Sequence, residues 1–203
     1  MIKTFVTVVS MLAEQDLLRL NYRPEGFELK KNRETSFPII PVIASTVKEN
    51  EEVRIIAIRP ENEDASDNFE TFLEELDEIG IPADCVQEIS VIEKQTLDIG
   101  ITLLMKVLQE IPADSLVYAD ITFGTKPVSA MLLYAMNFIE KLKDAEVEGI
   151  YYGEIPRHQG RPIYDRATIY ELTAFKYLAG IIDELNQLEV KNPLDALQRL
   201  IDK

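Results

Sequence analysis

One short polar loop concentrates the residues of this sequence that could bind an anion. Residues 120–127 (DITFGTKP) follow an apolar run and precede a helical pattern. Pro127 suits the first position of a helix, where a missing backbone N–H is no loss. The free N–H groups of such a helix start attract an anion, and Lys126 adds a full positive charge beside them. Since Thr122 and Thr125 also offer hydroxyl groups, the loop predicts a phosphate site.

Two common nucleotide-binding motifs are absent from the sequence. No G-x-x-x-x-G-K-[ST] run occurs, so the loop is not a P-loop, and the lack of G-x-G-x-x-G argues against an ordinary dinucleotide dehydrogenase. Asp120 stands at the head of the loop. Because its carboxylate would repel phosphates, we expect it to accept hydrogen bonds from the loop's own N–H groups.

Other candidate site residues follow two further apolar runs. Ser10 and Met11 come directly after the first run, although small polar residues also end many strands without any function. Tyr152 could stack on a base, or could simply pack or lie exposed. Arg157 stands in a polar turn, from which it either reaches a phosphate or belongs to a plain surface loop.

The positions of these residues depend on an alternation of strand and helix patterns. Strands are predicted at Thr4–Val9, Val53–Ile58, Cys85–Ile92, Leu116–Ala119 and Val147–Tyr152. Helices are predicted at Phe37–Val47 with Ser36 as N-cap, Asp67–Ile79 with Gly80 as stop, Thr96–Ile111, Pro127–Leu142, Glu171–Leu185 and Asn192–Ile201. Residues 20–33 break this rhythm and suggest a hairpin or flap.

Strands separated by helices imply right-handed parallel crossovers. The expected fold is therefore an α/β, Rossmann-like, doubly wound and mostly parallel sheet, with a short helical C-terminal tail. We expect residues 1–155 to form the ligand-binding domain and residues 156–203 to form a loop and the tail. In such sheets ligands bind beyond the carboxyl ends of the strands, which places the candidate loops at one edge.

The distribution of charge along the sequence limits which partners the chain is expected to bind. The chain has 203 residues and a net charge of -15, and residues 34–125 hold all of the excess acid. The flanks are free to be locally basic, as in the segment with Arg157, Arg161 and Arg166. A long nucleic acid needs a broad basic face and is not expected to bind. A small anionic ligand in a local pocket fits this distribution.

Three features that the sequence lacks bear on the cellular compartment, on membrane contact and on cofactors. The single cysteine, Cys85, cannot form an internal disulfide, which favours the reducing cytoplasm. No apolar run approaches the roughly 20 residues that cross a bilayer, and we expect no membrane contact. No cluster of His, Cys and carboxylate with metal-ligand spacing occurs, so neither a metal nor a cofactor is expected.

The loop also carries a family resemblance. Asp120-x-Thr122-x-x-x-Lys126, between a strand and a helix, resembles the second signature motif of CARF domains, the CRISPR-associated Rossmann-like sensors. The run LVYADITFGTKPVSAMLLYAMNF and the later VEGIYYGE are similar to the TM1812-like branch. Ser10 lies where the first motif of that family has a small polar residue.

The resemblance implies a homodimer that binds a cyclic oligoadenylate, most simply cyclic tetra-adenylate, as a messenger of type III CRISPR antiviral defence. A ring of identical nucleotides has its own two-fold axis and fits such a dimer. We place the ligand against residues of three segments: Ser10, Met11, Thr122, Phe123, Gly124, Thr125, Lys126, Tyr152 and Arg157. A downstream effector domain or protein would read the bound state.

Two other functions stay open at this point. The first is a metal-independent ring nuclease, in which a ligand 2′-OH attacks its neighbouring phosphorus and leaves a 2′,3′-cyclic phosphate. Lys126 would then stabilise the charge of the transition state and Ser10 would orient the ligand. The second is an unrelated Rossmann-like nucleotide-binding enzyme.

Overall fold

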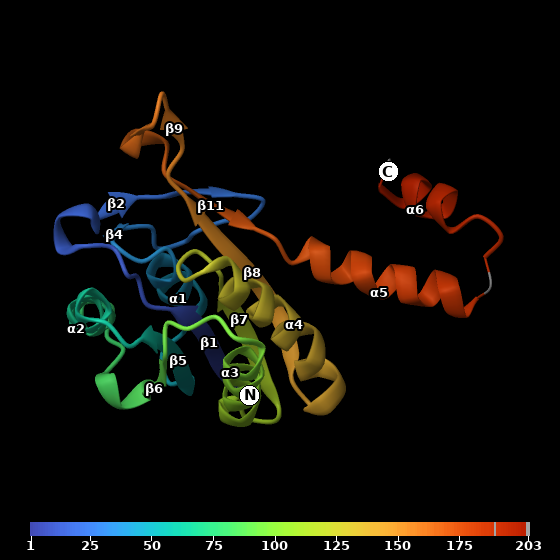
Figure 1. Ribbon diagram of the computed structural model, residues 1–203, viewed down its shortest axis with the longest axis horizontal. Helices are drawn as coiled ribbons and strands as arrows, with labels where there is room; N and C mark the ends of the chain where they lie inside the picture. Colours follow the sequence, from blue (N-terminus) through green and yellow to red (C-terminus); the bar gives the residue numbers. More distant parts are fainter. Residues whose placement is uncertain (189, 202–203) are drawn as a thin grey trace. The chain divides into compact units, whose positions relative to one another are not determined.

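The computed structural model describes residues 1–188 and 190–201 (Figure 1). The chain divides into two compact units, Met1–Glu171 and a second unit that begins at Leu172. No helix in the described ranges is both long and apolar enough to cross a membrane. The candidate site residues all belong to the first unit.

A seven-stranded sheet forms the first unit, in the order β3-β11-β8-β7-β1-β5-β6. Its strands are β1 Ile2–Val8, β3 Arg23–Glu25, β5 Val53–Pro60, β6 Val86–Val91, β7 Ser115–Asp120, β8 Glu146–Glu154 and β11 Thr168–Glu171. Each neighbouring pair is parallel except β11 with β8. This confirms the predicted mostly parallel, Rossmann-like α/β fold.

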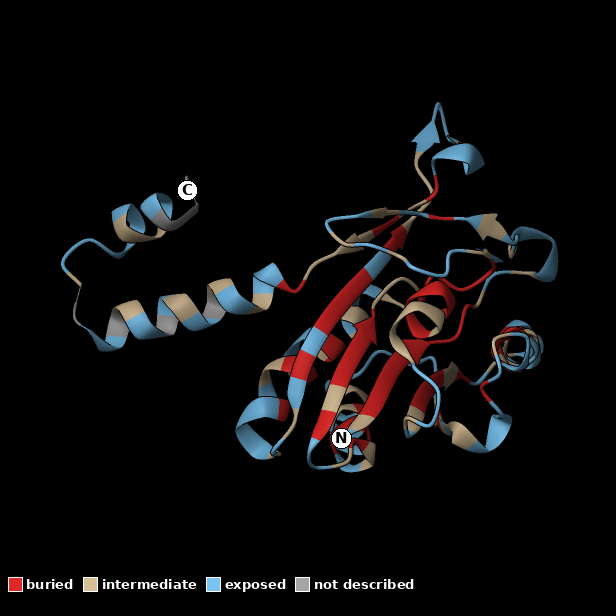
Figure 2. Ribbon diagram, turned by 180° about the vertical axis from the view of Figure 1, so that it is seen from behind, coloured by how far each residue is buried: buried red, intermediate tan, exposed pale blue. Residues whose placement is uncertain are grey.

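Two layers of helices cover the two faces of this sheet. Helices α1 (Ile39–Thr46) and α2 (Glu63–Asp77) pack on one face, where Phe5 stacks on Tyr118 with ring centroids 4.9 Å apart. Helices α3 (Leu97–Glu110) and α4 (Lys126–Leu142) cover the other face. Figure 2 shows the central strands as buried over most of their length, as their near-continuous apolar runs predict.

Short elements surround this frame. The strands β2 (Leu20–Asn21) and β4 (Glu34–Thr35) pair with each other, and β9 (Arg157–His158) pairs with β10 (Arg161–Pro162). Three 3-10 turns lie at η1 Glu14–Asp16, η2 Ala83–Cys85 and η3 Tyr164–Arg166. The second unit contains the helices α5 (Ala174–Gln187) and α6 (Pro193–Ile201).

The segment of residues 20–33 differs from its prediction in one respect. Its residues 23–25 join the main sheet as β3, because β11 offers a free edge beside them. The backbone N–H of Arg23 also donates to the carbonyl of Ala167 at 2.9 Å. The prediction of a plain hairpin or flap therefore missed an edge strand.

The predicted N-cap at Ser36 is wrong. Helix α1 begins at Ile39, and its N-cap is Pro38. The backbone N–H of Ser36 instead donates to Oε1 of Glu75 on α2 at 2.9 Å. A buried carboxylate needs donors, and Glu75 takes this one together with the Thr35 hydroxyl, so the helix starts later.

Candidate functional site

The carboxyl ends of β1, β7 and β8 lie at the same edge of the sheet and bring the candidate loops together. The N–H of Ile121, just past β7, donates to the carbonyl of Tyr151 on β8 at 2.9 Å. On the other side of β1, the N–H of Val9 donates to the carbonyl of Ile58 at 2.8 Å. Because these bonds continue the sheet ladder past the strand ends, the loops start from fixed positions.

Asp120 anchors the loop from inside the protein. Its carboxylate is fully buried, and Oδ1 accepts hydrogen bonds from the backbone N–H of Thr122 at 2.9 Å and from the Thr122 hydroxyl. Burial raises the pKa of Asp120 to about 6, although the bonds from Thr122 and Thr7 oppose this shift. The expectation that Asp120 binds its own loop is confirmed.

Thr122 links this anchor to β8. Its hydroxyl oxygen accepts a hydrogen bond from the N–H of Gly153 at 2.7 Å while its proton goes to Asp120. An added Cβ at Gly153 would clash with Pro38, so only glycine lets the strand approach this closely. The Thr122 hydroxyl is therefore occupied within the protein and does not face a ligand.

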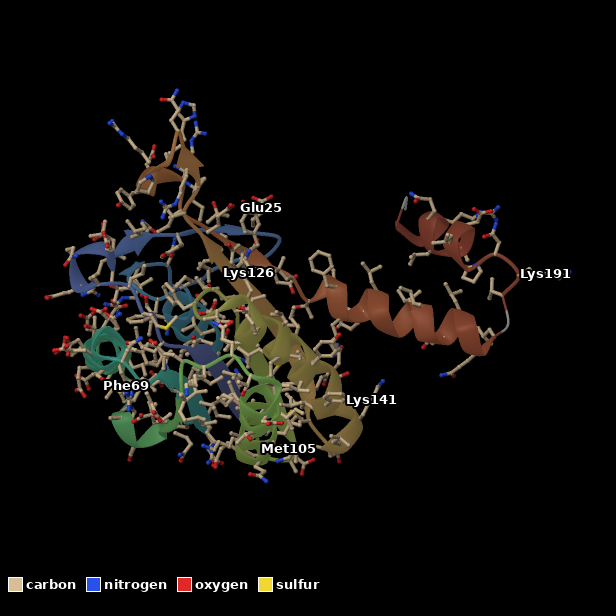
Figure 3. All side chains as sticks on the ribbon, viewed as in Figure 1. Glu25, Phe69, Met105, Lys126, Lys141 and Lys191 are labelled. Carbon is tan, nitrogen blue, oxygen red and sulfur yellow. The ribbon has the colours of Figure 1, made fainter. Side chains whose placement is uncertain are left out.

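The next residues turn the chain into α4. Gly124 has a φ of +93°, and an added Cβ would lie 3.0 Å from Cγ1 of Val8. Thr125 is the N-cap of α4 without a side-chain cap bond, and its buried Oγ1 has no partner in the described ranges. Lys126 is exposed at the first position of this 17-residue helix. Figure 3 labels Lys126 near one end of α4 and Lys141 near the other.

A cavity of about 590 Å³ adjoins this loop. It opens between α3 and α4 at the carboxyl edge of the sheet. Most of its lining is apolar, and among the lining residues are Val8, Met11, Ile58, Leu97, Ile101, Gly124, Thr125, Met131 and Tyr134. The structure thus brings Met11, Gly124 and Thr125 to one cavity, and places Lys126 next to its rim.

Ser10 lies deeper than the loop surface. Its side chain is fully buried, and its hydroxyl oxygen accepts a hydrogen bond from the N–H of Leu12 at 3.1 Å. The carbonyl of Ser10 in turn accepts from Nδ2 of Asn68 at 2.9 Å. In this arrangement Ser10 shapes the loop after β1 and presents no hydroxyl to solvent.

Phe123 also faces the interior. Its ring meets Phe37 edge to face, with centroids 6.0 Å apart. It lines a small cavity of about 160 Å³, together with Leu12, Tyr22 and Ile155. The aromatic side chain therefore fixes the loop from the face opposite to α4.

Tyr152 and Arg157 extend the site along β8. Tyr152 is 38% exposed and lies in register with Tyr170 of β11. Strand alternation places its ring on the sheet face that α4 covers. Arg157 is exposed three residues past β8, in the hairpin formed by β9 and β10.

One supporting residue escaped the sequence prediction. Nδ2 of Asn68 on α2 donates to the carbonyls of Ser10 and Leu12, at 2.9 and 2.8 Å. The signal was present, because Asn68 continues the apolar stripe of Ala65, Phe72 and Leu76 at helical spacing. A polar residue in a buried stripe indicates a hydrogen bond to another segment.

The comparisons with known proteins give a distant relative. No family model matches the chain. The sequence is 24% identical over 126 residues to the CRISPR-associated protein MJ1674 of Methanocaldococcus jannaschii. The match covers 55% of this chain and 20% of that relative, so it spans about a fifth of the relative's length. Within the described ranges, no group of three His, Cys, Asp or Glu residues could hold a metal ion.

Proposed function

We propose that this chain is a CRISPR-associated sensor that binds a cyclic oligoadenylate at the carboxyl edge of its sheet. The observation that carries the proposal is the position of Lys126, exposed at the start of a long helix and next to the largely apolar cavity. The relative named as a CRISPR-associated protein supports the cellular setting. A cytoplasmic location belongs to the same proposal.

The start of α4 supplies the chemistry for a phosphate. The first N–H groups of a helix have no intrahelical acceptor, and they carry the positive end of its dipole. Lys126 adds an ammonium group there, and the unpartnered Oγ1 of Thr125 lies one residue before it. A phosphate at this position would receive one charged and several neutral donors.

The adjoining cavity fits the base of the same ligand. Adenine presents flat apolar faces and a few polar edge atoms, which suits a cavity of about 590 Å³ with mostly apolar walls. Met11 and Tyr134 line it from two different elements. Tyr152, on the same face of the sheet, offers a further ring for stacking.

We also propose that two copies pair across α3 and α4. These helices expose several large apolar side chains, among them Leu97 at 78%, Tyr134 at 63% and Leu142 at 68%, with Ile101, Met105 and Phe138. Apolar groups gathered on one face indicate an interaction surface. Pairing there would place two Lys126 loops around one symmetric ring.

Sensing is favoured over cleavage by the burial of Ser10. A ring nuclease that used Ser10 would need its hydroxyl at the ligand, whereas this oxygen accepts from Leu12 inside the loop. Lys126 alone can bind a phosphate but does not align an attacking 2′-OH. The bound state would then be read by an effector domain or by another protein.

Calorimetry with cyclic tetra- and hexa-adenylate tests this function, with ATP and NAD as comparison ligands. We expect one ring per dimer and no tight binding of ATP or NAD. Chromatography of the recovered ligand shows in the same experiment whether it was cut. Equal or tighter binding of NAD or ATP would contradict the proposal and favour an unrelated nucleotide enzyme.

A further inference from the structure

The β9–β10 hairpin stands up from the end of β8 on a fixed base (Figure 1). Its turn residues Gln159 and Gly160 have φ values of +50° and +80°, the left-handed pair of a tight hairpin turn. The N–H of Ile163 donates to the carbonyl of Pro156 at 2.8 Å and closes the base. Figure 2 shows the hairpin as exposed. It is therefore an ordered projection.

The arginines of the first unit fall into two groups. Four of them pair with carboxylates: Arg19, Arg33, Arg54 and Arg59. The other four are exposed and form no ion pair with any carboxylate in the described ranges: Arg23, Arg157, Arg161 and Arg166. All of the second group lie in the hairpin or directly beside it.

Arg23 lies beside the hairpin because its strand, β3, pairs with β11. It is in register with Thr168 of β11, and its N–H donates to the carbonyl of Ala167, next to Arg166. Asp165 is the one acidic residue between positions 155 and 170. Glu25, Glu154 and Glu171 lie on the neighbouring strands, so the positive charge is local to the four guanidinium groups that form no ion pair in the first unit. Guanidinium groups without a carboxylate partner can bind an anion.

The chemical type of these positive groups limits the class of ligand that they could bind. All four side chains are guanidinium groups, whose planar donors match phosphate oxygens in pairs. Tyr164, which is 43% exposed, and His158 add rings at the same projection. Guanidinium groups beside rings suit a flexible oligonucleotide, which offers both phosphates and base faces.

The base of the hairpin touches the loop that carries Lys126. Gly153 donates to the Thr122 hydroxyl, and Ile155 lines the same small cavity as Phe123. From Gly153 to Arg157 the chain runs four residues, about 13 Å at the usual rise of a strand. The arginines of the hairpin thus begin about 13 Å of chain beyond the strand residue that contacts the loop, a span that a ligand with several phosphates can bridge.

We propose that Arg161 and Arg166, with Arg23 and Arg157, bind further phosphates of an oligonucleotide that has one phosphate at Lys126. The hairpin thereby selects ligands by the number of their phosphates, favouring oligonucleotides over mononucleotides. This inference rests on the proposed function and adds a specificity element to its site.

The test compares Arg161→Ala/Arg166→Ala with wild type by calorimetry at several salt concentrations. The probes are cyclic tetra-adenylate, cyclic hexa-adenylate, linear tetra-adenylate and AMP. We expect the double variant to bind the cyclic ligands at least about tenfold more weakly. The slope of log affinity against log salt should also fall by about 0.7 for each phosphate that the variant no longer binds. AMP binding should not change.

Two controls separate charge from structure. Arg54→Ala removes an arginine from the start of β5, where it pairs with Glu110 at 2.7 Å, and should leave ligand affinity and salt slope as in wild type. Arg161→Lys/Arg166→Lys keeps the charge and should recover the salt slope but only part of the affinity. The linear probe shows whether the hairpin needs a closed ring or only several phosphates.

The possible outcomes separate the inference about the hairpin from the proposed function. If wild type binds cyclic oligoadenylate and the double variant binds it with the same affinity and slope, the hairpin inference is overturned while the proposed function stands. An equal loss of AMP affinity would also overturn selection by phosphate number. If wild type binds none of the oligonucleotides, the proposed function itself fails. In that case the exposed arginines would be free for an acidic protein partner.

Discussion

The Thr7 hydroxyl donates a hydrogen bond to Oδ2 of Asp120 across 3.0 Å in the buried interior. Thr7 lies on β1 and Asp120 ends β7, so this bond joins the ends of two neighbouring strands. The other oxygen of the same carboxylate holds Thr122. One buried side chain therefore fixes both the strand ends and the loop that leads to Lys126.

Asp120 should make the stability of the protein depend on pH. Burial raises its pKa to about 6 in the folded protein, whereas the pKa of an unfolded aspartic acid is about 3.9. Between these two pKa values Asp120 is protonated in the folded chain and ionised in the unfolded chain. The contribution of Asp120 to the free energy of unfolding should thus be largest below pH about 4, and roughly 3 kcal/mol of it should be lost by pH about 7.

Asp120→Asn tests this dependence. The amide keeps the size of the side chain, and it can accept from Thr122 and donate to Thr7. Urea unfolding at several pH values should show that the variant gains stability relative to wild type as the pH rises. Asp67→Asn, at an exposed position of α2, is the control and should not change the pH profile this way. Parallel profiles for Asp120→Asn and wild type would contradict the prediction.

Lys126→Ala should weaken the binding of cyclic oligoadenylate while the fold stays intact. A charge-assisted hydrogen bond is worth about 1.5–3 kcal/mol, and a symmetric dimer loses it twice. Calorimetry should show the weaker affinity, and Lys126→Arg should restore it in part, because a guanidinium needs more room at a helix start. Lys141→Ala, in the last turn of the same helix, is the matched control. Unchanged affinity of Lys126→Ala would remove Lys126 from the site.

Gly124→Ala should distort the loop. Its φ of +93° is strained for any residue with a Cβ, and that atom would press on Val8 at 3.0 Å. We expect a loss of about 1–2 kcal/mol in the free energy of unfolding, together with weaker ligand binding. Gly100→Ala, within α3 and with open space around its Cβ, should instead raise stability by up to about 1 kcal/mol. A stable, fully binding Gly124→Ala variant would contradict this account of the loop.

Much of the frame around the site could be predicted from the sequence. Apart from Arg54 near its start, the run VRIIAI from Val53 to Ile58 is apolar, as a central parallel strand buried on both faces requires, and it forms β5. Pro127 and Lys126 indicated where α4 begins, since propensity and dipole act locally. Asp120 was correctly expected to bind its own loop, because the bond spans two residues.

Other parts depend on interactions that no local pattern contains. Strand β3 is Arg-Pro-Glu, a sequence without strand character, and it pairs because β11 lies beside it. The burial of Ser10 depends on Asn68, 58 residues away, which binds the Ser10 carbonyl. The local sequence pattern of a small polar residue at a strand end is the same whether its side chain faces a ligand or the interior.

The pairing of two copies gives a further prediction. Wild type should scatter light as a dimer at micromolar concentration, because α4 exposes Tyr134 and Phe138 beside the apolar residues of α3. Tyr134→Glu/Phe138→Glu should give monomers, since two added charges would be buried in the interface. Leu18→Glu, at an exposed position of the first unit after η1, is the control and should stay dimeric. A wild-type monomer with and without ligand would refute the pairing.

The last prediction concerns the fate of the ligand. Since the Ser10 hydroxyl is buried and accepts from Leu12, the protein should hold cyclic oligoadenylate without cutting it, and intact ring should be recovered after hours with excess dimer. Ser10→Ala should then lower stability by about 1 kcal/mol and leave the ligand equally intact. Chromatography of the labelled ligand, with and without EDTA, decides the matter. An EDTA-resistant product ending in a 2′,3′-cyclic phosphate would show that the site is a metal-independent ring nuclease, with Lys126 stabilising the transition state. Cleavage that EDTA stops would show instead that a metal ion takes part.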